Sequence, residues 1–540
     1  MVCQPPRRGI PRSERVFKRI HLRPVAAIAS ISVLAGCGVL SSGDDDGEQK
    51  IVVGTTSSPS TLDPAASWDG SWELFRNIYQ TLLSYPTGAT VPEGDAAESC
   101  AFTDLSNRVY SCKLRDDMKF SDGHPLDAKA VKYSIDRISR INVDGGPKGL
   151  LGSLDRVETK GDDEVLFHLN KPDATFPYVL ATPAMSIVDP EEYPANEIRD
   201  DGGVAGSGPY ALESYDEGSK AELVRNKHYK GFADRKNDAV TIRYFPDSTQ
   251  MVAALKSRQI DVTFRGLAAE DTIALQGKDS TQGLQLVEGA GTEISYLVFN
   301  PKDRWAGKAS VRKAIAQLLD RSAIAHKVYR DTVEPLYSMV PRGLAGHTTS
   351  FFDQYGTPDA DKAKDILTED GITEPVPLTL WYATDRYGSA TKPEFEEIKR
   401  QLNRTGLFDV KVEGRPWKTF EADYRKGKYP VFGRGWFPDF PDADNFIAPF
   451  VGEQNVLGTP YRSPDITDKL LPESRRENDR SAVVEQFQEA QQILLDDVRL
   501  LPLWQGKQYV AVHEDISGGE RALDPSMLMM MWELDRKTSW

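Results

Sequence analysis

The chain has 540 residues, of which 39% are apolar and 27% are charged, a composition typical of folded globular proteins rather than disordered or low-complexity ones. At roughly 150 residues per domain, this length predicts about three to four domains. The 66 Lys and Arg residues against 81 Asp and Glu give a net charge of −15. That balance argues against a nucleic-acid-binding protein, which needs an excess of basic side chains to neutralise phosphates.

The N-terminus has the pattern of a secretory signal peptide. Residues 1–23 carry seven basic side chains and one acidic one, and an apolar run of 13 residues follows from Pro24 to Gly36. This run is shorter than the roughly 20 residues that a membrane-spanning helix needs. It ends in Leu34-Ala35-Gly36-Cys37, which resembles the lipobox of bacterial lipoproteins. We therefore expect cleavage after residue 36 and lipidation of Cys37. An ordinary secreted protein with a cysteine near its cleavage site is the alternative.

A flexible tether is expected after the lipidated cysteine. Residues 37–50 are rich in Ser, Gly and Asp, a composition that suits a linker between a lipid and a folded body. Removing residues 1–36 takes away seven positive charges and one negative charge, a net +6, so the mature chain carries −21. The protein would then hang from the outer face of a membrane.

Two cysteines remain in the mature body, Cys100 and Cys112. The turn-prone residues between them, around 104–107, predict a hairpin whose strands place the two thiols opposite each other. Outside the cytoplasm such a pair is normally oxidised to a disulfide. A two-cysteine metal site is the alternative, but no His or third Cys lies nearby in the sequence, and zinc usually takes four ligands.

The body of the chain alternates between strand and helix patterns, which indicates an α/β architecture. A short buried strand is expected at 51–54, an amphipathic helix over 72–83, and a second helix from 125 to about 140 with Asp127 near its start. The remaining expected elements are a hairpin over 210–224, a helix at 248–257, strands at 260–262 and 293–300, a helix at 310–328, elements at 378–382, 393–402, 410–412, 417–425 and 431–436, a helix at 481–496, and extended chain at 501–512. No repeat of 20–50 residues is present, which disfavours a solenoid or a propeller.

Nine short segments then stand out between residues 62 and 446. They are Leu62-Asp63-Pro64, residues 77–85 (NIYQTLLSY), 113–131 (KLRDDMKFSDGHPLDAKAV), 206–210, 225–229 (RNKHY), 255–261, 296–300, 311–321 (VRKAIAQLLDR) and 435–446 (GWFPDFPDADNF). Each alone is a weak signal. Together, in this order and behind a lipobox, they resemble the family 5 extracytoplasmic solute-binding proteins, the dipeptide, oligopeptide and nickel receptors of ABC importers. Most of the matching residues are expected to be structural.

The resemblance implies an α/β, two-lobed fold like that of periplasmic binding proteins, of type II, with an extra subdomain inserted in the first lobe. On that basis the first lobe would comprise residues 51–83, 204–293 and 509–540, the insertion 84–203, and the second lobe 294–508. A hinge would lie in the crossovers near 291–292 and 505–506, where glycine absorbs changes in φ and ψ at little steric cost. Two fixed domains joined by an ordinary linker are the alternative.

The resemblance also implies a site for recognition rather than reaction. An extended peptide offers backbone donors and acceptors that an added strand can satisfy, and a buried carboxylate should meet its ammonium group. The residues carried over for these roles are Gly435, Trp436 and Phe437 for strand contacts, Asp439 for the α-amino group, Trp68, Asp69 and Gly70 on the opposite edge, and Arg434 for a carboxylate.

Several alternatives stay open at this site. Asp442 and Asp444 could replace Asp439 as the ligand contact, or all three acids could belong to an acidic surface loop in which Asp caps a turn or helix. A calcium loop is less favoured, because the later Gly and Glu of an EF-hand are missing. Trp436 and Phe440 are expected to line the cleft. The residues at 381–382 are expected to be core rather than lining.

These observations predict a lipid-anchored, monomeric receptor that captures a short peptide and passes it to an ABC permease, without cofactor, metal or nucleic acid. Receptors for nickel or its chelate, haem or an oligosaccharide are alternatives on the same scaffold. A surface hydrolase and an adhesion or signalling module are alternatives from other classes. An enzyme is disfavoured because the six histidines outside the signal peptide are scattered singly. The sequence also contains no zinc-binding His-Glu-x-x-His helix, nucleophile elbow or phosphate loop.

Overall fold

The computed structural model describes residues 50–66, 70–276, 283–452 and 455–537. The expected signal peptide and all but the last residue of the tether lie outside these ranges. Among the described residues, no helix combines the length and the apolar character needed to cross a membrane.

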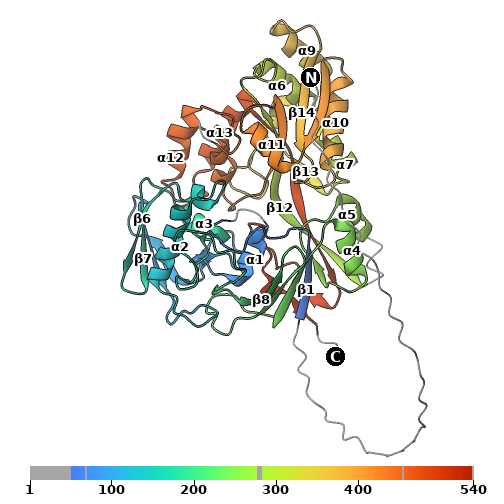
Figure 1. Ribbon diagram of the computed structural model, residues 1–540. Helices are drawn as coiled ribbons and strands as arrows, with labels where there is room; N and C mark the ends of the chain where they lie inside the picture. The colour runs from blue at the N-terminus through green and yellow to red at the C-terminus, as the bar shows by residue number, and fades with distance from the viewer. Residues whose placement is uncertain (1–49, 67–69, 277–282, 453–454, 538–540) are drawn as a thin grey trace, which may run out of the picture. The chain divides into compact units, whose positions relative to one another are not determined.

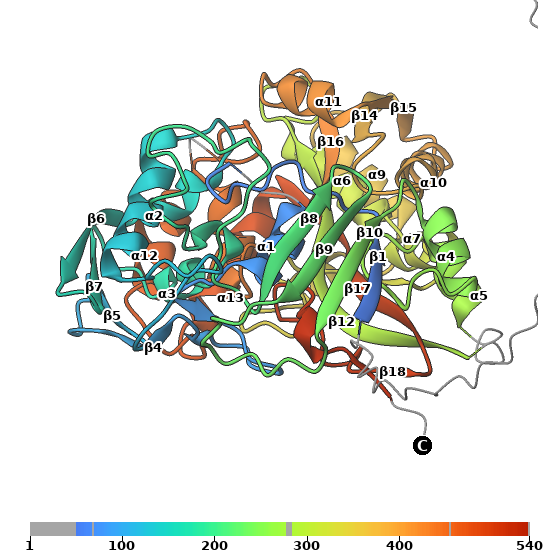
Figure 2. The ribbon, with the colours of Figure 1, turned by 60° about the horizontal axis from the view of Figure 1, so that its bottom comes forward.

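An eleven-stranded sheet runs through the protein in the order β15-β14-β16-β12-β17-β11-β1-β10-β9-β8, with β13 paired to β17 (Figure 2). The first half of this sheet consists of β1 (Lys50–Thr55), β8 (Tyr210–Asp216), β9 (Lys220–Arg225), β10 (Ala239–Tyr244) and β11 (Val262–Thr263). The second half consists of β13 (Val333–Pro335), β14 (Val376–Ala383), β15 (Phe408–Arg415) and β16 (Val431–Trp436).

Two long strands, β12 (Leu284–Phe299) and β17 (Leu500–His513), join the halves (Figure 1). Residues 284–290 of β12 pair with 507–513 of β17, and the register then shifts before residues 294–298 pair with 500–505. The shift leaves residues 291–293 outside the ladder. A Cβ at Gly291 would lie 2.4 Å from the carbonyl oxygen of Gly506, so only glycine permits this close backbone crossing.

Each half has its own apolar core. The main core of the first half packs around α1 (Ser71–Ile78), and a smaller cluster packs around α4 (Ser248–Lys256) and α5 (Ala269–Leu275). In the second half, one cluster includes α6 (Ala309–Leu318), α7 (Arg321–Lys327), α8 (Ser350–Tyr355), α9 (Ala360–Glu369) and α10 (Thr391–Asn403). Another includes α11 (Trp417–Tyr424), α12 (Leu471–Ser474) and α13 (Val484–Asp497). Because separate cores can keep their packing while their junction changes, this layout suits two bodies joined by a strand pair.

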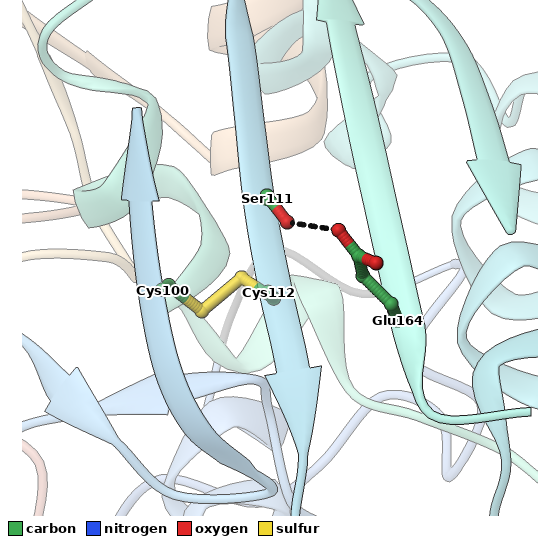
Figure 3. Close-up of a disulfide and its surroundings, with 4 residues drawn as sticks. All are labelled: Cys100, Ser111, Cys112 and Glu164. Atoms are coloured by element: carbon green, nitrogen blue, oxygen red, sulfur yellow. Dashed lines mark hydrogen bonds between the residues drawn. A yellow bond between two sulfur atoms is a disulfide. The ribbon is translucent and has the colours of Figure 1, made fainter. Parts of the chain in front are cut away.

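A separate antiparallel sheet lies between β1 and β8 in the sequence. Its order is β4-β5-β7-β6, formed by β4 (Ala97–Phe102), β5 (Val109–Leu114), β6 (Leu154–Lys160) and β7 (Glu164–Leu169). The helix α2 (Ala128–Ile141) packs against β6 and β7. Cys100 and Cys112 face each other directly in the β4–β5 register and are joined by a disulfide (Figure 3).

The smaller elements complete the chain. They are β2 (Leu83–Ser84), β3 (Glu93–Gly94), α3 (Phe176–Leu180), β18 (Ile516–Ser517) and β19 (Asp535–Arg536), together with short helical turns at Pro147–Leu151, Pro183–Met185, Ala443–Phe446, Ala448–Phe450, Asp465–Leu470 and Met531–Glu533.

Most of the predicted elements are confirmed, and three differ for identifiable reasons. The helix expected over 72–83 ends at Ile78, because Tyr79 is extended and its hydroxyl donates to the Leu62 carbonyl at 2.8 Å. The helix expected over 310–328 is two helices, broken where Asp320 caps α7 by accepting a bond from the Ala323 N–H. The strand expected at 293–300 begins instead at Leu284.

Asp63 of the Leu-Asp-Pro segment holds the inserted sheet to the first half. Its carboxylate is fully buried and receives both Nη atoms of Arg137 from α2, at 2.7 and 2.5 Å. The backbone N–H groups of Ala65 and Arg199 also donate to it, at 2.9 and 2.8 Å. Four donors therefore satisfy one buried carboxylate, which is the condition under which a buried ion pair is tolerated.

Replacing Asp63 by Asn should destabilise the protein strongly, because Arg137 would remain buried without its counter-charge. We expect the free energy of unfolding to fall by about 3–5 kcal/mol in urea denaturation. The matched control is Asp136→Asn, which breaks a half-exposed pair with Lys132 and should cost less than about 1 kcal/mol. Equal losses in the two variants would contradict the anchoring role of Asp63.

Candidate functional site

The end of β16 and the residues that follow it connect the two halves of the fold. We call residues 435–440 the junction segment. The ring of Phe437 lies 5.2 Å from the guanidinium carbon of Arg265, which follows β11 in the first half. The ring of Phe440 lies 6.1 Å from that of Tyr178 in the inserted region and joins the main core of the first half. The junction segment therefore starts in the second half, and two of its aromatic rings, those of Phe437 and Phe440, contact the first half.

The three acids of this region are buried but have different surroundings. Asp442 receives a two-pronged ion pair from Arg480 at 2.8 and 3.0 Å, and Asp444 receives one from Arg475 at 2.8 Å for both bonds. Asp442 also caps the turn at Ala443–Phe446 by accepting the Asp444 N–H. These two carboxylates are therefore committed to holding the second half together. The alternative of an acidic surface loop is wrong, although the capping role is confirmed for Asp442.

Asp439 is oriented by a neutral amide instead. The Nδ2 of Asn445 donates to its Oδ2 at 2.8 Å, and the Asn445 Oδ1 accepts the Asp439 backbone N–H at 2.9 Å. Only 4% of the Asp439 surface is exposed. This reciprocal pair fixes the orientation of the carboxylate near the end of the junction segment.

The strand residues before Asp439 are placed by close packing. A Cβ at Gly435 would lie 2.8 Å from Cε1 of Tyr387, so glycine lets the ring pack onto the backbone. The indole of Trp436 donates to Asn445 Oδ1 at 3.1 Å and packs edge-on against Phe450 in the second-half core. The expectation that this indole lines a cleft is therefore wrong, because the indole packs against aromatic residues in the core of the second half.

The other predicted site residues have varied outcomes. Arg434 is sandwiched by Trp417 and Tyr424, with its guanidinium carbon 5.6 and 5.3 Å from their ring centres, and its Nη1 donates to the Val456 carbonyl. A role in binding a ligand carboxylate stays a prediction. Gly70 precedes α1 as its N-cap residue, whereas Trp68 and Asp69 lie outside the described residues.

The adjacent aromatic residues of β14 follow the expectation that they belong to packed structure. Tyr382 is buried in the second-half core, and Trp381 stacks on Tyr429 with ring centres 4.4 Å apart. Phe440 is also buried, but in the first-half core. It thus acts as a packing contact between the halves, which corrects the expectation that it lines a cleft.

The structure adds Arg265, which the sequence did not single out. Its φ is 56°, a left-handed conformation that is uncommon for a residue other than glycine. The Nε lies 2.8 Å from Glu73 Oε1 of α1, and Nη2 donates to the Met527 carbonyl at 3.1 Å. These contacts hold the guanidinium beneath Phe437. The sequence signal available for it was its position just beyond the carboxyl end of β11.

Glu293 is the second addition, and it lies in β12 where the register breaks. Burial raises the pKa of its carboxyl to about 7, against the opposing effect of the Arg265 and Arg386 guanidinium groups. A Cβ at Gly435 or at Gly506 would lie 3.5 Å from its oxygens. Glu293 therefore lies next to Gly506, at the strand crossover of β17, and next to Gly435, at the start of the junction segment. Charges of both signs converge there, an arrangement that can bind a zwitterion.

Comparison with known proteins identifies the scaffold. Residues 91–458, more than half of the chain, match the bacterial extracellular solute-binding proteins, family 5 Middle. The chain belongs to this family. It is 28% identical over 489 residues to the probable D,D-dipeptide-binding periplasmic protein DdpA of Escherichia coli (strain K12), covering 87% of this chain and 90% of that protein. It is 25% identical over 515 residues to the glutathione-binding protein GsiB of Salmonella paratyphi A (strain ATCC 9150 / SARB42), covering 92% and 95%.

The solved structures agree on the fold. The ABC transporter-associated periplasmic binding protein DppA from Helicobacter pylori, in complex with the peptide STSA, superposes with a TM-score of 0.76 at 21% identity, covering 91% of this chain and 99% of that one. The predicted α/β, two-lobed fold is thus confirmed. As a member of the family, the protein is a solute-binding protein of the ABC importer type and not an enzyme.

A second buried acid near Glu293 makes stability depend on pH. Glu394 is 2% exposed and accepts bonds from the Tyr329 hydroxyl at 2.7 Å and the Trp504 indole N–H at 2.9 Å. Burial outweighs these donors and raises the pKa of the Glu394 carboxyl to about 7. The folded protein therefore keeps a proton that the unfolded chain releases near pH 4.5.

We expect Glu394→Gln to flatten the pH dependence of stability between about pH 4.5 and 7. The wild type binds more protons folded than unfolded in this window, so its free energy of unfolding should fall as pH rises through it. The variant lacks this contribution, and the difference should approach about 3 kcal/mol across the window. Urea denaturation at several pH values measures it. Glu396→Gln, an exposed position on the same helix, is the control, and parallel pH profiles for Glu394→Gln and wild type would refute the assignment.

Proposed function

We propose that this protein is a lipid-anchored receptor that captures short peptides between its two lobes and delivers them to an ABC permease. The observation that carries the proposal is the junction segment. It contains a buried carboxylate, Asp439, which Asn445 of the second lobe orients and which lies between two aromatic residues, Phe437 and Phe440, that contact the first lobe. Two curated relatives bear names that specify peptide ligands, a D,D-dipeptide and glutathione.

A free peptide presents the groups that this arrangement can satisfy. Its α-ammonium would pair with Asp439, whose carboxylate the Asn445 amide orients. Its backbone would add to the strand end at Gly435 and Phe437 in the manner of β-augmentation. Such recognition depends on backbone and terminus rather than on side chains, so it tolerates different peptide sequences.

Capture needs a hinge, and the proposed hinge is the break in the β12–β17 ladder. Residues 291–293 have no partner in the register, and their neighbours across the sheet are Gln505 and Gly506. On this proposal the first lobe comprises 51–83, 204–293 and 509–540 with the insertion 84–203, and the second lobe comprises 294–508. Few backbone dihedral angles would have to change for the lobes to close.

The Asp439→Asn variant tests the amine contact. With a pool of tripeptides as probe, we expect its affinity in calorimetry to fall by at least about thirtyfold, because losing one partner of a buried charge pair costs about 2 kcal/mol or more. N-acetylated tripeptides lack the ammonium group, so they should bind wild type and variant with equally low affinity.

Asp409→Asn, an exposed acid on β15, is the matched control and should bind like wild type. A change within twofold for Asp439→Asn would reject the amine contact while leaving a peptide receptor possible. If neither tripeptides nor dipeptides bind the wild type, the peptide class itself is wrong.

The anchor is tested separately through Cys37. In a bacterial host that processes lipoproteins, wild-type protein should partition into the detergent phase of Triton X-114, because a diacylated chain end is strongly apolar. Cys37→Ser should move the protein to the aqueous phase, whereas Cys3→Ser, within the expected signal peptide, should change nothing. Aqueous partitioning of the wild type would favour the ordinary secreted form.

A further inference from the structure

Two loops of the inserted region bring together a histidine and two carboxylates away from the junction segment. Asp122 and His124 lie in the loop before α2, and Asp189 follows the helical turn at Pro183–Met185. The Nδ1 of His124 lies 2.7 Å from Asp189 Oδ2 and 3.6 Å from Asp122 Oδ2. One ligand atom from each residue lies within 4.8 Å of the others.

In each of the two carboxylates, Oδ1 is held by a backbone N–H group, and this bond directs Oδ2 toward His124. Asp122 Oδ1 accepts the His124 backbone N–H at 3.0 Å, and Asp189 Oδ1 accepts the Glu191 backbone N–H at 2.8 Å. Those bonds leave both Oδ2 atoms turned toward the same ring nitrogen. Backbone N–H groups therefore hold one oxygen of each carboxylate, and the His124–Asp189 hydrogen bond of 2.7 Å joins the two loops.

The loops that carry these residues are themselves fixed. The first is closed by a bridge between Lys119 and Pro125, and the Phe120 N–H donates to the His124 carbonyl at 2.9 Å. The second is held where the Val188 N–H donates to Ser134 Oγ of α2 at 3.0 Å. A rigid support of this kind is what a metal site needs from its surroundings.

The charges at this point do not balance. The Asp189 side chain is only 1% exposed, and Glu191 Oε2 lies 3.9 Å from His124 Nε2. Among the ion pairs of the described residues, no Lys or Arg pairs with Asp122 or Asp189. Even a protonated imidazole leaves an excess of negative charge around a buried carboxylate, which is unfavourable without a further cation.

We propose that Asp122 Oδ2, His124 Nδ1 and Asp189 Oδ2 form a binding site for a divalent cation of the zinc class. One imidazole nitrogen with two carboxylate oxygens is a donor set that zinc accepts, and water would complete the tetrahedral shell. The spacing of the donors requires only that His124 and Asp189 separate slightly to admit the ion. A bound cation would tie the loop before α2 to the loop after Pro183–Met185, so it would strengthen the inserted region without touching the peptide.

Two other histidines provide matched controls, because each faces a single carboxylate. His168 Nε2 lies 2.8 Å from Glu158, and His326 Nδ1 lies 2.9 Å from Asp331. Neither has the second carboxylate that distinguishes His124. Replacing them removes an imidazole of similar surroundings but no proposed metal ligand.

The experiment is calorimetric titration of the mature, chelator-treated protein with zinc chloride. We expect one ion per chain in the wild type, in His168→Ala and in His326→Ala, and at least tenfold weaker binding in His124→Ala. Because Asp189 is buried, the half-exposed Asp122→Asn serves as the second variant, and circular dichroism confirms that each variant folds. The thermal midpoint of the wild type should rise with zinc, and that of His124→Ala should not.

Several outcomes would overturn the proposal. These are absence of saturable zinc binding in the wild type, unchanged affinity in both His124→Ala and Asp122→Asn, or loss of affinity in the control variants. The proposal would also be overturned if calcium bound as tightly as zinc and the His124→Ala substitution left that affinity unchanged. Such a result would mean that the carboxylates alone bind the ion, without the imidazole. Tripeptide affinity should be the same in His124→Ala and wild type, which separates this test from that of peptide capture.

Discussion

The pairing of β12 with β17 is the constraint on which the rest of the structure depends. These strands run through both halves of the sheet, and their ladder is interrupted at residues 291–293, with a smaller register shift between Ser295 and Tyr296. Everything that characterises the candidate site is attached near that interruption. Glu293 lies in it, β16 pairs with β12 immediately beyond it, and the junction segment continues from the end of β16. On the proposed function, the main interruption of this ladder is both the hinge between the lobes and the place where the charged groups gather.

Patterns within short stretches of sequence were sufficient to predict those helices and strands whose formation depends on neighbouring residues in the chain. The helix α2 follows from apolar periodicity and from the cap at Asp127, whose carboxylate accepts the Lys129 and Ala130 N–H groups. The hairpin of β8 and β9 and the strand β16 follow from alternation and turn residues. Predictions failed where distant contacts decide the backbone. Nothing near Tyr79 in the sequence reveals that its hydroxyl will bond to Leu62 and to Tyr193, yet those bonds end the helix early.

The candidate site shows the same division between local pattern and distant contact. The segment at 435–446 (GWFPDFPDADNF) was sufficient to find Asp439, because its residues are contiguous in the sequence. It could not separate Asp439 from Asp442 and Asp444, since the arginines that neutralise the latter two come from more than thirty residues later. Arg265 and Glu293 belong to no motif at all. They become part of the site only because the crossing strands bring them beside residues that are far away along the chain.

The four-donor network around Asp63 has a mechanical consequence. By binding α2 through Arg137 and the later chain through the Arg199 N–H, it ties the inserted region to the first lobe at two places. On the proposed function, a subdomain held in this way would move together with the first lobe. The rearrangement proposed for capture would then be concentrated at the strand crossing, and the proposed permease, docked on the outer surface, would sense a single angular displacement rather than a set of independent shape changes.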